Sequence, residues 1–177
     1  MVSRPAEHEF APFYLTYVSL VPETDILSVL EKQTPLVELL GKAVSPDRET
    51  FRYAPRKWSI REVFGHMIDA ERVFAYRAFC ISRGETAALP SFDENAYVAS
   101  SLYNDQPLKS LLAEFTSTRT SSLAFLSRLS EQDWLRTGTA SAKPVSVRAL
   151  AYIMAGHVRH HLNGLQTSYG VSGGRGA

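Results

Sequence analysis

Apolar residues recur at spacings of three and four in four separate stretches of the chain, as they do along the buried side of an amphipathic helix. In the first stretch, Ile26, Val37 and Leu40 mark such a side. The four stretches predict helices over about residues 25–43, 59–84, 104–129 and 147–166. Four helices separated by fairly long connections predict an all-α fold, a four-helix bundle.

Polar residues at the helix boundaries support these limits. Ser59 and Glu62 have the spacing of a capping box, in which each side chain bonds a free backbone amide of the other residue. Gly84 is a natural residue just beyond the C-terminus of the same helix. Asp105 and Ser146 are expected to cap the third and fourth helices.

The segments outside the helices are an arm, several loops and a tail. Residues 1–22 carry too many apolar side chains to remain in water, and their prolines prevent a long helix, so we expect an arm packed over the bundle. Residues 85–103 form a long connection that could border a pocket. Residues 137–144 predict a loop or a small hairpin, and the glycine-rich residues 170–177 predict a frayed tail.

Composition limits the classes of function. A chain of 177 residues predicts a single domain, 1–177, and the formal net charge of +1 creates no field that would attract nucleic acid or an anionic membrane. Cys80, the single cysteine, permits no intramolecular disulfide and fits a reducing cytoplasm. No apolar run approaches the roughly 20 residues of a membrane span. We therefore expect a cytoplasmic protein that binds neither nucleic acid nor a membrane.

The candidate chemistry lies in the fourth predicted helix. His157 and His161 are four residues apart, so their side chains share one face, at a spacing that lets two imidazoles bind one metal ion. Both occupy positions of the bundle-facing seam where leucine is expected, whereas His160 lies one step to the side. His66, on the apolar side of the second helix, is the candidate third ligand. A shared metal ion would remove the cost of burying these rings.

Other interpretations remain open at this point. His66 alone would more often be a hydrogen-bonded core histidine, and His157 and His161 could be ordinary helix residues. The three together favour a metal site. A di-iron carboxylate bundle would need inward Glu-x-x-His motifs, and neither this motif nor HEXXH occurs in the sequence.

A longer pattern surrounds these histidines. The run WSIREVFGHMIDAER from Trp58 to Arg72, followed by HVRHH at residues 157–161, resembles the DinB superfamily, which includes DinB/YfiT-like metal-dependent hydrolases and relatives of bacillithiol- and mycothiol-dependent transferases. The similarity extends to the arm and to FDENAY at residues 92–97, and it covers nearly the whole chain. It implies an up-down-down-up four-helix bundle with one divalent ion, zinc or nickel, held by His66, His157 and His161.

The resemblance leaves the reaction open. Three imidazole ligands leave one coordination position for a water, whose pKa the metal lowers, or for a substrate thiolate. A metal-dependent hydrolase acting on a small molecule is the leading expectation. The alternatives are a transferase that uses a low-molecular-weight thiol and a non-catalytic metal- or ligand-binding bundle. A homodimer is also left open.

Three further charged residues are candidates for supporting roles. Asp69, one turn after His66, could orient an imidazole, although a carboxylate on the helix surface is the simpler interpretation. Arg77 and Arg159 could bind an acidic substrate, and a solvated face is again the simpler interpretation. No side chain is assigned as the catalytic group.

Overall fold

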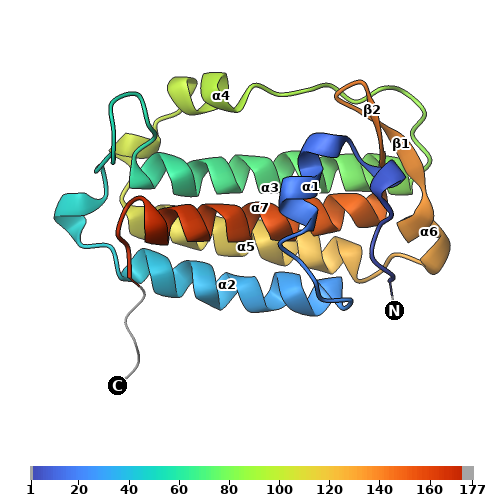
Figure 1. Cartoon of the computed structure of the whole chain (residues 1–177), viewed down its shortest axis with the longest axis horizontal. Helices are drawn as coiled ribbons and strands as arrows, with labels where there is room; N and C mark the ends of the chain where they lie inside the picture. Colours follow the sequence, from blue (N-terminus) through green and yellow to red (C-terminus); the bar gives the residue numbers. More distant parts are fainter. Residues whose placement is uncertain (1, 173–177) are drawn as a thin grey trace.

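Four long helices run along the molecule in the computed structural model, which describes residues 2–172 (Figure 1). α2 and α3 each pack against both α5 and α7, so the four helices form a ring in the order α2, α5, α3, α7. Their bounds are α2 Ile26–Lys42, α3 Ile60–Ser82, α5 Leu108–Leu126 and α7 Val147–Thr167. The predicted all-α four-helix bundle is confirmed.

The directions of the helices give the up-down-down-up topology. Asn104, just before α5, accepts a 2.7 Å hydrogen bond from Ser59, which caps α3, so α3 and α5 begin at the same end. Gly138, shortly before α7, lies against Ile81 at the end of α3, so α7 runs back along α3. Figure 1 shows α2 running in the direction of α7. The topology implied by the resemblance is thus the observed one.

The parallel arrangement of α3 and α5 requires a long return connection. Residues 83–107 travel back along the bundle and contain α4 (Glu94–Ser100) and the 3₁₀ turn η4 (Tyr103–Asp105) (Figure 1). After α5 come α6 (Glu131–Leu135) and an antiparallel hairpin of β1 (Thr137–Ala140) and β2 (Lys143–Ser146). The small hairpin left open by the sequence is therefore present.

Most of the predicted caps are observed. The capping box of α3 is complete, with the Ser59 amide 2.7 Å from Glu62 Oε2 and the Glu62 amide 3.1 Å from Ser59 Oγ. Gly84 has a φ of +84°, as a glycine after a helix permits. The prediction that Asp105 caps the third helix is wrong. Pro107 is the N-cap residue, and the Leu108 amide donates to Glu49 Oε2 at 3.0 Å, a carboxylate from a distant loop.

The arm is packed over the bundle as expected. It contains the 3₁₀ turns η1 (Glu7–Glu9) and η2 (Pro12–Tyr14) and the short helix α1 (Leu15–Val18), which packs on α7. At the other end of the chain, the expected fraying does not extend to Val171, which is buried and whose amide donates to Leu165 O. Residues 173–177 of the predicted tail lie outside the described residues.

The core consists of two apolar clusters separated by a buried polar layer. One cluster includes Leu30, Ala70 and Met154, and the other includes Val37, Met67 and Val158. Each of α2, α3 and α7 supplies apolar residues to both clusters. Where it passes from one cluster to the other it carries buried polar residues: Gln33 on α2, His66 and Glu71 on α3, and His157 on α7. Within residues 2–172, no helix is both long and apolar enough to cross a membrane.

Candidate metal centre

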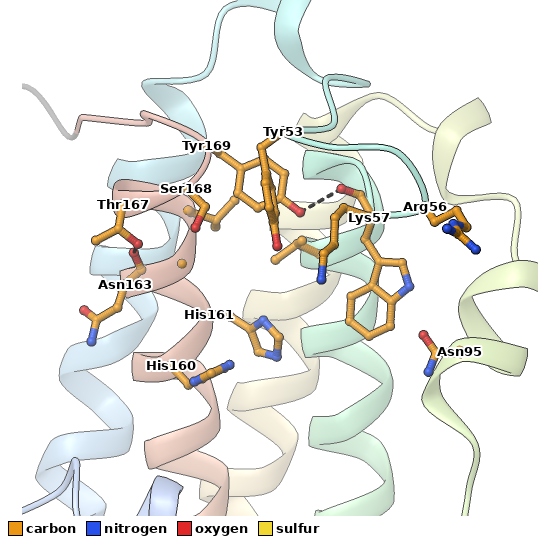
Figure 2. Close-up of a pocket in the computed structure, with 14 residues that line it drawn as sticks. Tyr53, Arg56, Lys57, Asn95, His160, His161, Asn163, Thr167, Ser168 and Tyr169 are labelled. Atoms are coloured by element: carbon orange, nitrogen blue, oxygen red, sulfur yellow. Dashed lines mark hydrogen bonds between the residues drawn. The ribbon is translucent and has the colours of Figure 1, made fainter.

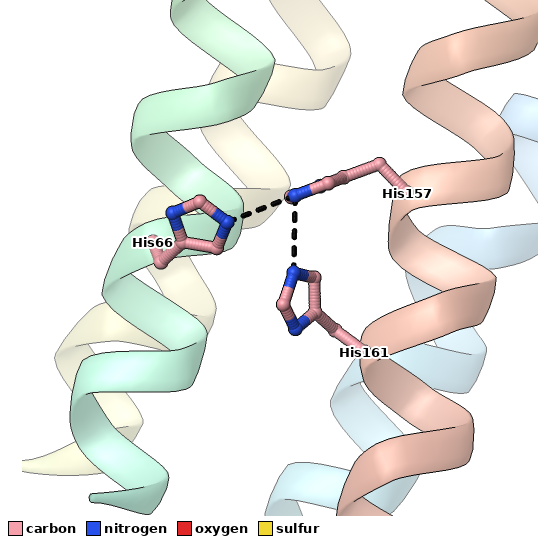
Figure 3. Close-up of side chains that lie close together, drawn as sticks. All are labelled: His66, His157 and His161. Carbon is pink, nitrogen blue, oxygen red and sulfur yellow. Dashed lines mark hydrogen bonds between the residues drawn. The ribbon is translucent and has the colours of Figure 1, made fainter. Parts of the chain in front are cut away.

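Three histidine rings converge in the polar layer between α3 and α7 (Figure 3). His157 Nε2 lies 2.9 Å from His66 Nε2 and 3.0 Å from His161 Nε2. One ring nitrogen from each residue lies within 4.8 Å of the other two. The structure thus brings together the three residues that the sequence singled out, two from successive turns of α7 and one from α3.

Hydrogen bonds among the three rings cannot satisfy all of their facing nitrogens. A neutral imidazole has one N–H and one unprotonated nitrogen. If His157 Nε2 carries its proton, it can direct that proton at only one of its two neighbours. If it does not, its single lone pair must accept from both. Three convergent nitrogen lone pairs are the donor set that binds a divalent transition metal ion, and these residues fit one.

Burial keeps the rings neutral. Removal from water lowers the pKa of His66 to about 4, with a smaller effect from His160. Burial, followed by the neighbouring rings of His161 and His66, holds the pKa of His157 well below its usual value of 6.5. Burial also lowers the pKa of His161 well below that value. At neutral pH all three rings are therefore neutral imidazoles, the form that metal binding requires.

Two glycines allow other segments to close over the histidine-bearing turns. A Cβ at Gly65 would lie 2.2 Å from Tyr103 Cδ2, and a Cβ at Gly156 would lie 2.1 Å from the carbonyl oxygen of Tyr17. Each glycine directly precedes the first histidine of its helix. The connection after α3 and the N-terminal arm can therefore both pack closely beside the triad, which we define as His66, His157 and His161.

Aromatic rings surround the triad on several sides. The Trp58 ring centroid lies 4.6 Å from that of His66, and the Tyr17 centroid lies 5.3 Å from that of His157. Phe74 makes an edge contact with His157 at 5.9 Å. These contacts leave the histidine rings little room to rotate, because interiors are close-packed.

A buried ion pair braces the bundle beside the triad. Arg119 on α5 donates to both carboxylate oxygens of Glu71 on α3, at 2.8 and 2.9 Å. Its third donor nitrogen lies 3.1 Å from Gln33 Oε1 on α2, and Gln33 Nε2 donates to Ala155 O on α7 at 2.7 Å. All four long helices are joined in this way, two residues before His157. The sequence does not reveal the pairing, because its members lie far apart along the chain.

Asp69 has partners other than the imidazoles. It accepts a hydrogen bond from the Tyr103 hydroxyl, and it lies 3.9 Å from an Arg72 guanidinium nitrogen. Burial raises the pKa of this carboxyl. Tyr103 belongs to the connection that precedes α5, so these contacts join that connection to α3.

The two arginines considered for an acidic substrate are bound within the fold. Arg77 is buried and donates to Pro90 O at 2.7 Å and to Ser141 Oγ at 3.0 Å. Arg159 pairs with Glu23 at 2.6 Å. Neither guanidinium is free to bind a ligand near the triad.

A pocket of about 590 Å³ opens beside the triad (Figure 2). His161 and the exposed His160 lie at its base, and the end of α7 forms one wall. The connection over residues 85–103, which was expected to border a pocket, contributes Asn95, and α3 contributes Val63. The loop of residues 53–58 forms a further wall that the sequence did not predict. Its signal was a group of aromatic and basic side chains directly before the capping box.

The fold and the histidine cluster define a four-helix bundle with a candidate three-histidine metal centre. The chain belongs to the DinB superfamily, whose family model matches residues 30–164. No curated protein matches the chain.

The fold has a counterpart among solved structures. The chain is similar to YfiT from Bacillus subtilis, which is described as "a probable metal-dependent hydrolase with an unusual four-helix bundle topology". The two are 18% identical, with a TM-score of 0.74 over 97% of this chain and 95% of the other. At this identity the likeness shows the fold.

Proposed function

We propose that this protein is a metal-dependent hydrolase that acts on a small molecule bound in the pocket beside His161. The observation that carries the proposal is the convergence of three neutral imidazoles, those of the buried His66 and His157 and of the half-buried His161, next to an open pocket. Membership of the DinB superfamily and the description of YfiT as a probable metal-dependent hydrolase support it.

His66, His157 and His161 would hold the ion, with zinc or nickel as the metals that suit imidazole ligands. A divalent ion bound there would supply Lewis acidity, which lowers the pKa of a water or a thiol. The chain's own contribution is to keep the three rings unprotonated by burial and to fix their orientation. His161 is the member of the triad that lines the pocket, so a substrate would approach from its side.

We propose His160 as the residue that transfers a proton. It is exposed, lines the pocket beside His161, and has its ring centroid 5.0 Å from that of His161. It is not a member of the triad. General acid or base catalysis by a positioned histidine contributes about 10²- to 10⁴-fold to a rate. We therefore expect His160 to protonate a leaving group from its ring nitrogen while leaving metal binding intact.

A thiol transferase is the second candidate, and one observation favours it. Among the described residues, no carboxylate lines the pocket that could serve as a general base for a water. A thiol, whose pKa is about 8.5 against 15.7 for water, needs less help to lose its proton. A low-molecular-weight thiol as co-substrate would suit the same site.

Metal removal and restoration test the proposed activity. The purified protein would be assayed on small esters, amides and lactones, and separately on small thiols with an alkylating electrophile. Turnover in one set should disappear on chelation and return with Zn²⁺ or Ni²⁺. The variant His160→Ala should keep its metal and lose about 10²-fold in rate. Turnover that is unchanged in metal-free protein would contradict the proposal.

A further inference from the structure

The pocket beside the triad carries an excess of positive charge. Its lining includes Arg56 and Lys57, and no acidic side chain among the described residues contributes to it. The chain as a whole is close to neutral, with 19 Lys and Arg against 18 Asp and Glu. The positive charge is therefore a local property of this pocket, at the end of the bundle where α3 begins.

The basic neighbours of these two residues are already paired. Arg52 lies 2.6 Å from a Glu62 carboxylate oxygen, and Arg61 lies 2.8 Å from Glu49. Arg56 and Lys57 have no carboxylate partner among the ion pairs of residues 2–172. Lys57 Nζ lies 5.9 Å from the centroid of the Tyr53 ring, a contact that does not neutralise its charge. A cation without a carboxylate partner at a pocket wall is available to an anionic ligand.

The backbone under these side chains is well fixed. The Lys57 amide donates to Ala54 O at 3.2 Å, and the Lys57 carbonyl accepts from Arg52 at 2.6 Å. The next carbonyl, of Trp58, accepts from the Tyr169 hydroxyl at 2.7 Å. Arg56 has a φ of +62°, in the left-handed region that non-glycine residues seldom adopt. A ligand would therefore meet two cations on an already ordered loop, which lowers the entropic cost of binding.

The Lys57 side chain carries its positive charge toward the triad. Figure 2 shows the Lys57 side chain extending from the loop into the pocket toward His161, with Tyr53 beside it and Arg56 at the edge. Trp58 provides an apolar surface beside His161, with its ring centroid 6.5 Å from that of His161. A small molecule could thus place an anionic group at Lys57 and a reactive group at His161.

We infer that the substrate of this pocket is a small molecule with an anionic group, a carboxylate or a phosphate, which Lys57 binds and the positive charge of Arg56 attracts, while its apolar part lies against Trp58. The inference rests on the proposed function and names the substrate class of the same site. The shared chemistry is an oxyanion that accepts charge-assisted hydrogen bonds.

Trp58 provides a direct readout of binding. The chain has two tryptophans, so the indole N–H groups give two NMR signals. Trp134 lies in α6, at the opposite end of the bundle from the pocket, and serves as an internal reference (Figure 1). Metal-free protein would be titrated with succinate, inorganic phosphate and neutral succinamide. Succinate or phosphate should shift the Trp58 signal, and Trp134 should not move.

Three variants make the test specific. Lys57→Ala should weaken anion binding by about tenfold, the loss of one charge-assisted hydrogen bond, and Arg56→Gly should weaken it by a smaller factor, the loss of a nearby charge. Glycine is the right replacement for Arg56 because it adopts a φ of +62° without strain. Lys32→Ala, an exposed lysine on α2 outside the pocket, should bind as the wild type does.

The two anions distinguish the two chemical sources, since tighter binding of one over the other identifies the preferred group. An unmoved Trp58 signal with both anions overturns the inference. So does equal binding by wild type, Lys57→Ala and Arg56→Gly. Because metal-free protein is used, a failure to bind metal or to turn over substrate would defeat the proposed function without affecting this result.

Discussion

At the scale of single residues, burial decides the behaviour of the triad. His66 and His157 are 5% and 4% exposed, so water hardly stabilises a positive charge on either ring. Considered from the sequence alone, metal binding should weaken as pH falls through about 6.5, the value for an exposed histidine. The structure moves this limit to lower pH, because burial lowers the pKa of His66 to about 4.

The same shift makes the metal-free protein sensitive to acid. Between pH 6.5 and about 4, His66 binds a proton in the unfolded chain and not in the folded one, so stability falls as pH falls. From pH 7.5 to 5.5 we expect the free energy of unfolding to drop by about 1 kcal/mol for this ring, with His157 and His161 adding to the effect. Urea unfolding at the two pH values measures it.

The range from pH 7.5 to 5.5 lies above the pH at which carboxyls with a lowered pKa titrate. The pKa of Glu9 is lowered by Arg148 and Ser146 to about 2 against the opposing effect of burial, so Glu9 contributes a loss of stability only below its unfolded value of 4.5. Stability that is equal at pH 7.5 and 5.5 would show that the rings are not buried as neutral groups.

At the scale of elements, local signals explain which boundaries could be predicted. The helix predicted over about residues 25–43 is observed at Ile26–Lys42. It could be predicted because its cap, Asp25, and its apolar repeat both lie within the segment itself. The third helix was placed over about residues 104–129 and is observed at Leu108–Leu126. The carboxylate that accepts the hydrogen bond of its first amide belongs to Glu49, some 60 residues away, and a contact at that separation leaves no local pattern.

The packing of α1 on α7 gives a prediction at the same scale. Gly156→Ala would place a methyl group 2.1 Å from the Tyr17 carbonyl oxygen, which is backbone and cannot rotate away. We expect a destabilisation of about 1–3 kcal/mol by urea unfolding, as for other overpacked sites.

Gly164 on the same helix is the matched control. A Cβ there would have no atom within 4 Å, so Gly164→Ala should stabilise the protein by roughly 0.5–1 kcal/mol through helix propensity. Equal effects at the two glycines would mean that the arm does not pack on α7 as described.

At the scale of the whole molecule, the ring of helices places α3 beside α7, and this adjacency forms the site. The spacing of His157 and His161 could be read from the sequence, and so could the apolar setting of His66. The connection that carries Asn95 was also expected to border a pocket. The wall formed by Lys57 and Trp58 could not be predicted, because only the fold brings their loop to the histidines. The ion pair between Arg119 and Glu71 could not be predicted for the same reason. The homodimer and the cytoplasmic location remain predictions.

The most direct test of the central claim is the metal content of the purified protein and of four single variants, measured by elemental analysis after dialysis against Zn²⁺ or Ni²⁺. The wild type and His160→Ala should each retain one ion per chain. The variants His66→Ala, His157→Ala and His161→Ala should each lose most of it, because two remaining imidazoles bind a divalent ion weakly. Full metal content in all three of these variants, or none in the wild type, would contradict a metal centre at the triad.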